Sequence, residues 1–298
     1  MLFILYHLWE WASFAFAPTN CYNIAMQLNR VGVFFNEQKQ YVLPLAQKAV
    51  DFLRQKNIQA QLLPNLENLP DFDVLISMGG DGTLLRCARA FAPKNVPILG
   101  INCGTLGFLA TAEQEEMPQV LQALLDGKCT SLNRLMLQVS VRQNGETQVM
   151  YALNDCVLHA STMRAFFVHG TFNGVEIPPY FGDGVIISTP TGSTAYSLAA
   201  GGPIVAPNVD VLVITPVCPH SLSERPMVLP AGGQLCLKPA FKSAEESAIA
   251  SFDGQIHIPL AAGAEVQITK APFALQLLTW PQRGFFNVLH KKLSWGRP

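Results

Sequence analysis

The sequence has few charged residues and no excess of either sign. Of its 298 residues only 14% are Asp, Glu, Lys or Arg, and the formal net charge is −1. A chain with so little net charge has no overall basic footprint, so we expect no nucleic-acid partner. By contrast, 49% of the residues are hydrophobic. At this length that supplies apolar side chains for one large domain or two ordinary ones.

Paired cysteines are also missing. The seven cysteines are scattered and odd in number, and no two of them form a Cys-x-x-Cys pair. This pattern argues against a disulfide framework and against a structural zinc site. It favours a reducing compartment, and we expect a cytoplasmic protein.

The sequence lacks a long, uninterrupted hydrophobic run. Residues 2–17 are apolar and aromatic, but polar and charged residues interrupt them, and they are too few for a membrane span of about 20 residues. They also lack the positive start of a secretory signal peptide. We therefore expect no membrane partner. Because a strand-like pattern follows Met26 almost at once, we predict that residues 1–25 are a non-native leader and that Met26 is the true start.

Residues 26–128 alternate between strand-like and helix-like patterns, and the sequence changes character after them. Alternation predicts an α/β domain with a mostly parallel, Rossmann-like sheet and flanking helices. The predicted strands are 31–35, 58–63, 74–78 and 97–101, and the predicted helices are 41–56 and 118–125.

Residues 129–272 consist of short strand-like runs with many turn signals between them, which predicts an all-β domain. Its strands are predicted at 135–142, 147–158, 165–172, 185–188, 209–215, 234–238, 248–252, 256–260, 265–269 and 274–278. Residues 287–292 look helical and amphipathic.

The most informative motif is Gly-Gly-Asp-Gly-Thr at 79–83, between a predicted strand and a helix-like run. Glycines let a phosphate approach backbone N–H groups, and a helix start adds unpaired donors and positive dipole. The motif is neither a Walker loop nor a dinucleotide fingerprint, because it lacks their Lys and glycine spacing. The predicted phosphate-site residues are Gly79, Gly80, Gly82, Thr83 and Arg86.

Asp81 needs an explanation, because a carboxylate repels phosphate. The economical one is that it handles a hydroxyl or a metal ion beside the phosphate. An ordinary turn with a capping Asp remains the alternative, and Arg86 is equally explained as a solvated helix charge. Asn102 also follows a predicted strand, so we expect it to face the same crevice as Asp81.

Two later segments carry further polar groups. They are Asn154-Asp155 and the run Ser-Thr-Pro-Thr-Gly-Ser-Thr-Ala-Tyr-Ser at 188–197. Alone, each is also explained as a turn or a capping loop. Together with residues 79–83, in this order and spacing, they resemble the bacterial NAD kinases from Met26 to the C-terminus. The Gly-Gly-Asp-Gly-Thr motif is shared with diacylglycerol-type lipid kinases and phosphofructokinase-like folds, whereas the two later segments are more specific.

The resemblance implies transfer of a phosphoryl group from ATP to the 2′-hydroxyl of the adenosine ribose of NAD, giving NADP. It implies a nucleotide between the two domains, a tail at 273–298 that packs back on the first domain, and a homo-oligomer, a dimer or tetramer. Mg²⁺ or Mn²⁺ should accompany ATP. Because the sequence shows no cage of carboxylates, the metal is expected to be held mainly by triphosphate and water.

The resemblance also implies residue roles. Asp81 matches the catalytic carboxylate, which takes the proton of the ribose hydroxyl. Further positions that match nucleotide-binding residues are Asn102, Phe108, Asn154, Asp155, Asp183, Ser193, Thr194, Ala195, Tyr196 and Ser197. Arg164 matches a variable position, and Gln255 matches a residue near the ligand across subunits. A core role for Phe108 and a turn role for Asp183 remain open.

Two other functions stay open at this point. One is a lipid kinase that shares only residues 79–83, although residues 189–197 have no place in it. The other is a non-catalytic regulator that binds NAD or NADP, which would require loss of the carboxylate, whereas Asp81 is intact. The sequence leaves open the preference between NAD and NADH, the phosphoryl donor and feedback regulation.

Overall fold

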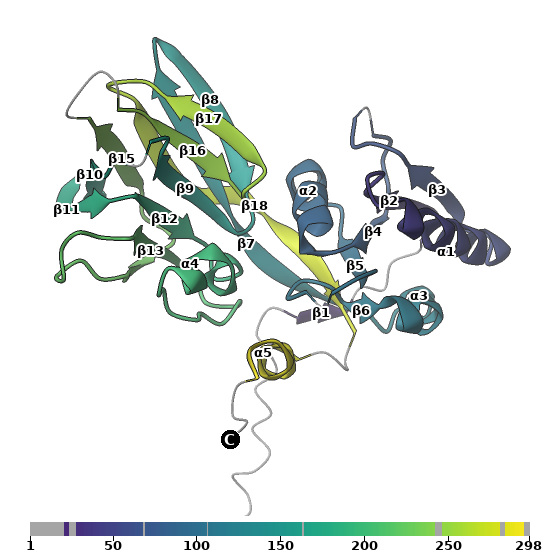
Figure 1. Cartoon of the computed structure of the whole chain (residues 1–298). Helices are drawn as coiled ribbons and strands as arrows, with labels where there is room; N and C mark the ends of the chain where they lie inside the picture. The colour runs from purple at the N-terminus through teal and green to yellow at the C-terminus, as the bar shows by residue number, and fades with distance from the viewer. Residues whose placement is uncertain are drawn as a thin grey trace, which may run out of the picture.

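The computed structural model describes residues 21–23, 28–67, 69–105, 107–162, 164–241, 246–280 and 284–294. They form an α/β half and a β-rich half, to the right and left in Figure 1, with helix α2 (Asp81–Phe91) on the side of the α/β half that faces the β-rich half. Of the predicted leader, only residues 21–23 are described. They form strand β1 (Cys21–Asn23), which pairs with β7 (Thr130–Gln143). The start at Met26 stays a prediction.

The α/β half confirms the predicted parallel sheet. Its strands lie in the order β3-β2-β4-β5 and all pair in parallel; they are β2 (Arg30–Phe35), β3 (Gln59–Leu63), β4 (Val74–Gly79) and β5 (Ile98–Asn102). Alternate residues of β4 pack on opposite faces. Val74 and Ile76 pack with α1 (Leu43–Gln55) and α3 (Met117–Leu125), whereas Leu75 packs with α2. Helices on both faces explain why β4 is buried along its whole length.

The β-rich half confirms the predicted all-β architecture. Two sheets pack face to face around a core that includes Leu137 and Leu237 from one sheet and Leu158 and Ile187 from the other. One sheet has the antiparallel order β14-β13-β12-β9-β16-β17. The strands of this half are β7, β8 (Glu146–Ala152), β9 (Asp155–Ala160), β10 (Phe166–Phe172), β11 (Val175–Gly182), β12 (Gly184–Ser188), β13 (Val211–Val217), β14 (Met227–Pro230), β15 (Leu235–Ala240), β16 (Ala248–Phe252), β17 (Ile256–Leu260) and β18 (Glu265–Thr279).

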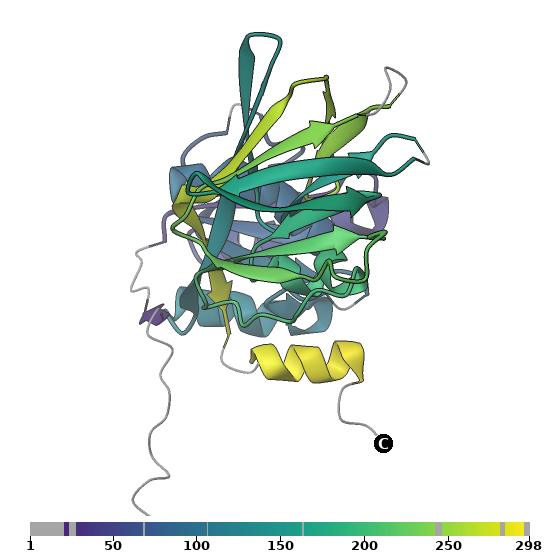
Figure 2. The same cartoon turned by 90° about the vertical axis from the view of Figure 1, so that its left-hand side faces the viewer.

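The other sheet runs through both halves of the molecule. Strand β18 pairs antiparallel with β7 and β15, and its end pairs in parallel with β5 at Leu277 and Leu278. This joins the α/β strands and the β-rich strands into one twelve-stranded sheet. Strand β18 crosses the predicted boundary at 272/273 without a break. Helix α5 (Phe285–Leu293) follows it and lies below both halves in Figures 1 and 2.

Several predicted elements were wrong in extent. The predicted strand 147–158 is two strands, β8 and β9, because the N–H groups of Leu153, Asn154 and Asp155 donate to a side chain, Asp253, rather than to a neighbouring strand. The predicted strands 265–269 and 274–278 are one strand, β18, with a register irregularity between Lys270 and Ala274. Helix α2 begins at Asp81, inside the glycine motif, because Gly80 already provides its N-cap.

Two edge strands of the β-rich half, β11 and β14, were not predicted. Strand β11 contains Pro178 and Pro179, which lack N–H donors, but it lies at the end of its sheet, where such gaps are tolerated. Strand β14 is short and also lies at an edge. The remaining short elements are β6 (Ala112–Glu113), α4 (Tyr196–Ala199) and 3₁₀ turns at Gln40–Val42, Ala92–Lys94, Gln114–Glu116 and Gly192–Thr194. No helix among the described residues is long and apolar enough to cross a membrane.

Candidate functional site

The glycine motif forms a tight junction between β4 and α2. Strand β4 ends at Gly79, and α2 begins two residues later at Asp81. A Cβ atom at Gly79 would collide with the Thr83 hydroxyl, which explains the glycine. Gly80 has open space around it, so a ligand can approach its backbone. The junction therefore presents the N-terminus of α2, with its unpaired donors, to the space beyond the sheet.

The Asp81 carboxylate is held by the loop that follows β5. Its Oδ2 accepts the N–H of Phe108 at 2.8 Å, and its Oδ1 accepts the N–H of Leu109 at 3.1 Å. A Cβ atom at Gly107 would collide with this carboxylate, so glycine is required there. An ionised carboxylate offers about four lone-pair sites. Two of them remain for a hydroxyl or another donor.

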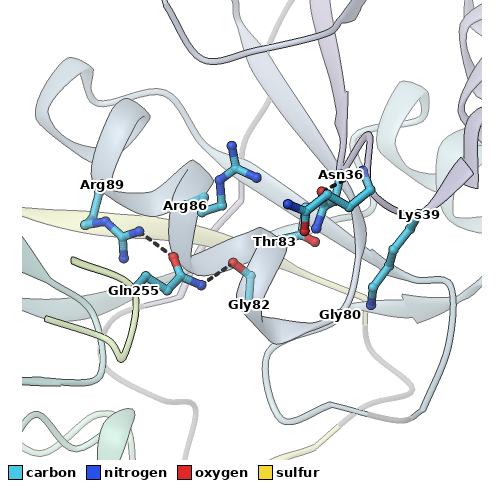
Figure 3. Close-up of a pocket in the computed structure, with 9 residues that line it drawn as sticks. Asn36, Lys39, Gly80, Gly82, Thr83, Arg86, Arg89 and Gln255 are labelled. Atoms are coloured by element: carbon cyan, nitrogen blue, oxygen red, sulfur yellow. Dashed lines mark hydrogen bonds between the residues drawn. The ribbon is translucent and has the colours of Figure 1, made fainter. Parts of the chain in front are cut away.

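A cavity of about 410 Å³ lies beside the start of α2 (Figure 3). Among the described residues that line it, Lys39, Arg86 and Arg89 are cationic and none is Asp or Glu; the full lining is Asn36, Gln38, Lys39, Gly80, Gly82, Thr83, Arg86, Arg89 and Gln255. The Arg86 guanidinium also lies 5.4 Å from the centre of the Phe34 ring. A concave site whose charged side chains are all positive, beside a helix N-terminus, suits phosphate.

Four residues of this cavity were not predicted from the sequence: Asn36, Gln38, Lys39 and Arg89. A signal was available for the first three, because residues 36–39 directly follow β2 at the sheet edge where β4 and β5 also end. Asn102, which the sequence placed at this edge, is the last residue of β5 and pairs with Gly79. Its Nδ2 donates to Gly104 O at 2.9 Å and to Glu113 Oε2 at 2.6 Å.

A second cavity, of about 450 Å³, brings together predicted residues of the later motifs. Asn154, Asp155, Ala195 and Tyr196 line it. Asp155 is buried, and its burial together with the charge of Asp253 raises the pKa of the Asp155 carboxyl to about 7. Carboxylate, amide and phenol groups around an apolar wall suit the hydroxyls and the base of a nucleoside.

The loop at 189–194 packs directly on the Asn154 segment. Thr189 donates its N–H to Asn154 O at 2.8 Å and its hydroxyl to Leu153 O at 2.6 Å. Gly192 has no room for a Cβ atom, because the Asn154 backbone lies against it. Two motifs that are more than thirty positions apart therefore form one wall.

Two predicted ligand residues, Ser193 and Ser197, use their hydroxyls inside the protein. Ser193 Oγ donates to Pro190 O at 2.7 Å and accepts the N–H of Val205 at 3.0 Å. Ser197 Oγ lies 2.8 Å from Thr215 Oγ1. Both side chains are fully buried, so in this arrangement they fix the shape of the loop.

The other predicted residues lie in different places. Asp183 lies near Tyr196, whose pKa is raised chiefly by burial and further by neighbouring negative groups that include Asp183. Phe108 and Thr194 line a third cavity, on the side of α5. Arg164 is exposed, and it lines none of these three cavities. Gln255, which was expected near a ligand across subunits, lines the cationic cavity of its own chain.

A buried ion pair connects the first two cavities. Arg89 on α2 donates to Asp253 Oδ2 at 2.7 Å, and the two side chains are 13% and 0% exposed. Asp253 also accepts the N–H groups of Leu153, Asn154 and Asp155 at 3.2, 2.8 and 3.3 Å. Since Arg89 lines the cationic cavity and Asp253 lines the second one, this pair fixes the distance between them.

Gln255 completes this connection, which we call the Arg89–Asp253–Gln255 clamp. Its Oε1 accepts a bond from Arg89, and its Nε2 donates to Gly82 O at 2.8 Å (Figure 3). Neither Arg89 nor Asp253 was predicted from the sequence as a site residue. No local pattern links two residues that are 164 positions apart, so only the fold identifies this pair.

Comparisons with known proteins agree with this geometry. The family model of the ATP-NAD kinase N-terminal domain matches residues 65–129, and that of the C-terminal domain matches residues 157–280. The NAD kinase of Citrifermentans bemidjiense is 33% identical over 90% of this chain and 99% of its own length. The NAD kinase of Aquifex aeolicus is 38% identical over 82% of this chain and 88% of its own length.

Solved structures of the same kind share the fold. Yeast NADH kinase complexed with NADH superposes with a TM-score of 0.83 at 25% identity, covering 94% of this chain and 93% of that one. An NAD kinase from Archaeoglobus fulgidus in complex with ATP gives 0.70 at 24% identity, covering 89% and 98%. Two family models that succeed each other along the chain, and relatives aligned over nearly its whole length, show that this chain belongs to the NAD kinase family.

Proposed function

We propose that this chain transfers the γ-phosphoryl group of ATP to the 2′-hydroxyl of the adenosine ribose of NAD, giving NADP and ADP. The observation that carries the proposal is the Arg89–Asp253–Gln255 clamp, which joins a cationic cavity to a cavity with nucleoside-type groups. The triphosphate of ATP occupies the first, and the ribose and base of NAD contact Asn154, Asp155 and Tyr196 in the second.

Asp81 acts as the general base in this proposal. A ribose hydroxyl is a poor nucleophile at neutral pH, and a carboxylate within about 3 Å takes its proton as attack proceeds. The N–H bonds from Phe108 and Leu109 orient the carboxylate and leave lone pairs for the hydroxyl. Gly80 and Gly82 at the start of α2 orient phosphate oxygens, because phosphoryl transfer depends mainly on positioning and charge neutralisation.

We further propose that Mg²⁺ or Mn²⁺ enters bound to ATP. Among the described residues, no group of three or more His, Cys, Asp or Glu side chains is placed to hold a metal. The lining of the cationic cavity would repel a free cation but suits one that arrives on a triphosphate, with the amide oxygens of Asn36 and Gln38 as available ligands. The metal supplies neutralisation of phosphate charge.

The direct test is an assay of purified protein with NAD, ATP and Mg²⁺, in which an NADP-specific dehydrogenase detects the product. NADP formation is expected. Parallel reactions with NADH as acceptor and with polyphosphate as donor define both preferences. Well-folded protein that forms no product with any of these combinations would refute the proposal.

Lys39 is expected to contribute to binding of ATP rather than NAD. It lines the cationic cavity, and one bond between a cationic donor and phosphate is worth about 1.5–3 kcal/mol. Lys39→Met, which keeps the length of the side chain, should raise the KM for ATP about tenfold and leave the KM for NAD nearly unchanged. Lys48→Met, at an exposed position of α1, is the control. If Lys39→Met and Lys48→Met change the KM for ATP equally, Lys39 does not have this role.

The affinity for NAD is expected to depend on pH through Asp155. Its pKa is about 7 in the free protein, and the ionised form accepts stronger hydrogen bonds from ribose hydroxyls than the protonated form does. Protonation therefore competes with binding, so the Kd for NAD should fall about tenfold between about pH 6 and about pH 8. Asp155→Asn should flatten this profile. A profile unchanged in the variant would exclude Asp155 as the group that controls the pH dependence.

We also propose that the protein works in the cytoplasm as a homo-oligomer, a dimer or a tetramer. The cysteines whose side chains are described are free thiols, which supports a reducing compartment. Exposed apolar side chains such as Val175, Leu222 and Phe286 support contacts with a further copy. Light scattering during size-exclusion chromatography measures the oligomer, and a monomer at assay concentration would refute this part.

A further inference from the structure

A third cavity, of about 600 Å³, lies between strands β7 and β18, the loop at 190–194 and helix α5. Its size is within the range of small-molecule sites. Much of its wall is aromatic: Phe108, Trp280, Phe285 and Phe286 line it. None of the described residues that line it is Asp or Glu, and one of them, Arg134, is charged.

Arg134 is a buried cation that has no counter-charge among the described residues. It lies on β7 opposite Leu275 of β18, and only 9% of its surface is exposed. Its Nε is buried and has no hydrogen-bond partner, and no ion pair to Arg134 occurs among the described residues. Burial alone lowers the pKa of the guanidinium to about 10, so it remains charged at neutral pH. Buried charges in proteins are normally paired, because an unpaired one is costly.

A second unsatisfied group lines the same cavity. Thr191 Oγ1 is buried and has no hydrogen-bond partner in the part of the chain that the structure describes, and the residue is 6% exposed. Unsatisfied buried groups are rare in native proteins. Two of them around one cavity, a guanidinium and a hydroxyl, are complementary to a ligand that brings acceptor oxygens and negative charge.

We propose that this cavity binds a small aromatic monocarboxylate, with its carboxylate on Arg134 and Thr191 and its ring among the aromatic side chains. A guanidinium fork matches a carboxylate in bidentate geometry. One negative charge balances the one cation of the lining, whereas a dianionic phosphate would leave a buried negative charge. The cavity shares Phe108 and Thr194 with the predicted nucleotide-binding residues, so the ligand lies next to the substrate site and is placed to modulate it.

The test uses two probes of nearly equal shape, benzoate and benzamide, which differ in charge. Benzoate should raise the Tm of the full-length protein in a saturable way, by about 2–5 °C at a concentration ten times its Kd. Benzamide should not. Equal shifts with both probes, or no shift with benzoate, would overturn the proposal.

Three variants test whether the rise in Tm with benzoate depends on the residues of this cavity. Arg134→Met should abolish the benzoate shift and should itself raise the Tm of the ligand-free protein, because it removes an unpaired buried charge. Arg142→Met is the matched control on the same strand, at an exposed position whose partner is Glu265, and it should keep the shift. Thr191→Val should weaken benzoate binding severalfold, which tests the site even if Arg134→Met folds poorly. A benzoate shift retained in Arg134→Met or unweakened in Thr191→Val would refute the assignment.

NAD itself is the competing occupant, and steady-state kinetics separates the two possibilities. On our proposal the KM for NAD of Arg134→Met stays within about twofold of the parent value. A KM for NAD raised tenfold or more would place Arg134 in the substrate site and overturn a separate carboxylate site. This comparison does not depend on which residue is the catalytic base.

Discussion

Asp81→Asn is expected to lower kcat by about 10²–10⁴-fold, the usual contribution of a positioned general base. The amide is neutral, and its carbonyl oxygen is far too weakly basic to take the proton of the ribose hydroxyl. It also has one acceptor oxygen, whereas Asp81 accepts the N–H groups of both Phe108 and Leu109. The KM for NAD should change little, because Asn154 and Asp155 lie in a separate cavity. Rapid-quench and steady-state assays of NADP formation measure the effect.

Controls separate lost chemistry from lost structure. Asp51→Asn, on the exposed side of α1 where Asp51 pairs with Gln47, should retain parent activity. The Tm of Asp81→Asn should stay within a few degrees of the parent, since the loop at 107–109 keeps one of its two bonds. A kcat above one tenth of the parent value would exclude Asp81 as the essential base and would favour a reaction carried by positioning alone.

Asp253→Asn is expected to be the most destabilising single change in the site. Asp253 Oδ1 accepts the N–H groups of Asn154 and Asp155, and Oδ2 accepts Arg89 and the N–H of Leu153. The single oxygen of an amide accepts the two donors on one side, and its NH₂ group, itself a donor, faces the two donors on the other side. The Arg89 guanidinium is then buried without its charge partner. Removing one member of a buried ion pair costs about 3–5 kcal/mol, a fall in Tm of roughly 6–20 °C.

Loss of the clamp should also reduce catalysis. Displacement of the Asn154 segment by about 1 Å is enough to lower kcat/KM by roughly 10²-fold. Asp210→Asn is the control, because its ion pair with Lys270 is exposed and such pairs contribute about 0–1 kcal/mol. Adding Arg89→Met to Asp253→Asn should recover part of the lost stability, since the unpaired cation is then gone. If the stability losses of Asp253→Asn and Arg89→Met simply add in the double variant, the two residues do not form a direct pair.

Local sequence patterns predicted most of the fold because the hydrophobic patterns typical of strands and of helices are both strong in this chain. Strand β4 is apolar at every position but Ser77 and Gly79, which is typical of a strand covered on both faces, and α1 shows one apolar face. Prediction failed where residues distant in the sequence determine where a strand ends or continues. The break between β8 and β9 depends on Asp253, and the continuity of β18 depends on its pairing with β7 along nearly the whole strand. Neither partner is visible locally.

The same division holds for the site. Motif residues such as Gly79 and Asp155 were found because their types and spacing are distinctive. Arg89 and Asp253 were missed because each looks ordinary in its own segment, a helix charge and a turn carboxylate. Their importance comes from the pair they form across the fold. Arg134 was missed for a related reason, since an arginine in a strand attracts notice only once its burial without a partner is known.

The place of β18 in the shared sheet has a consequence for synthesis in the cell. Residues 98 and 99 of β5 pair on one side with β4 and on the other with residues 277 and 278 of β18. A growing chain has every other strand of its α/β half long before residue 277 leaves the ribosome. Until then the edge of β5 is an open template for strands of other chains. The nascent protein therefore needs protection against aggregation until residues 277 and 278 are made, and translation products that stop before them should be especially prone to aggregation.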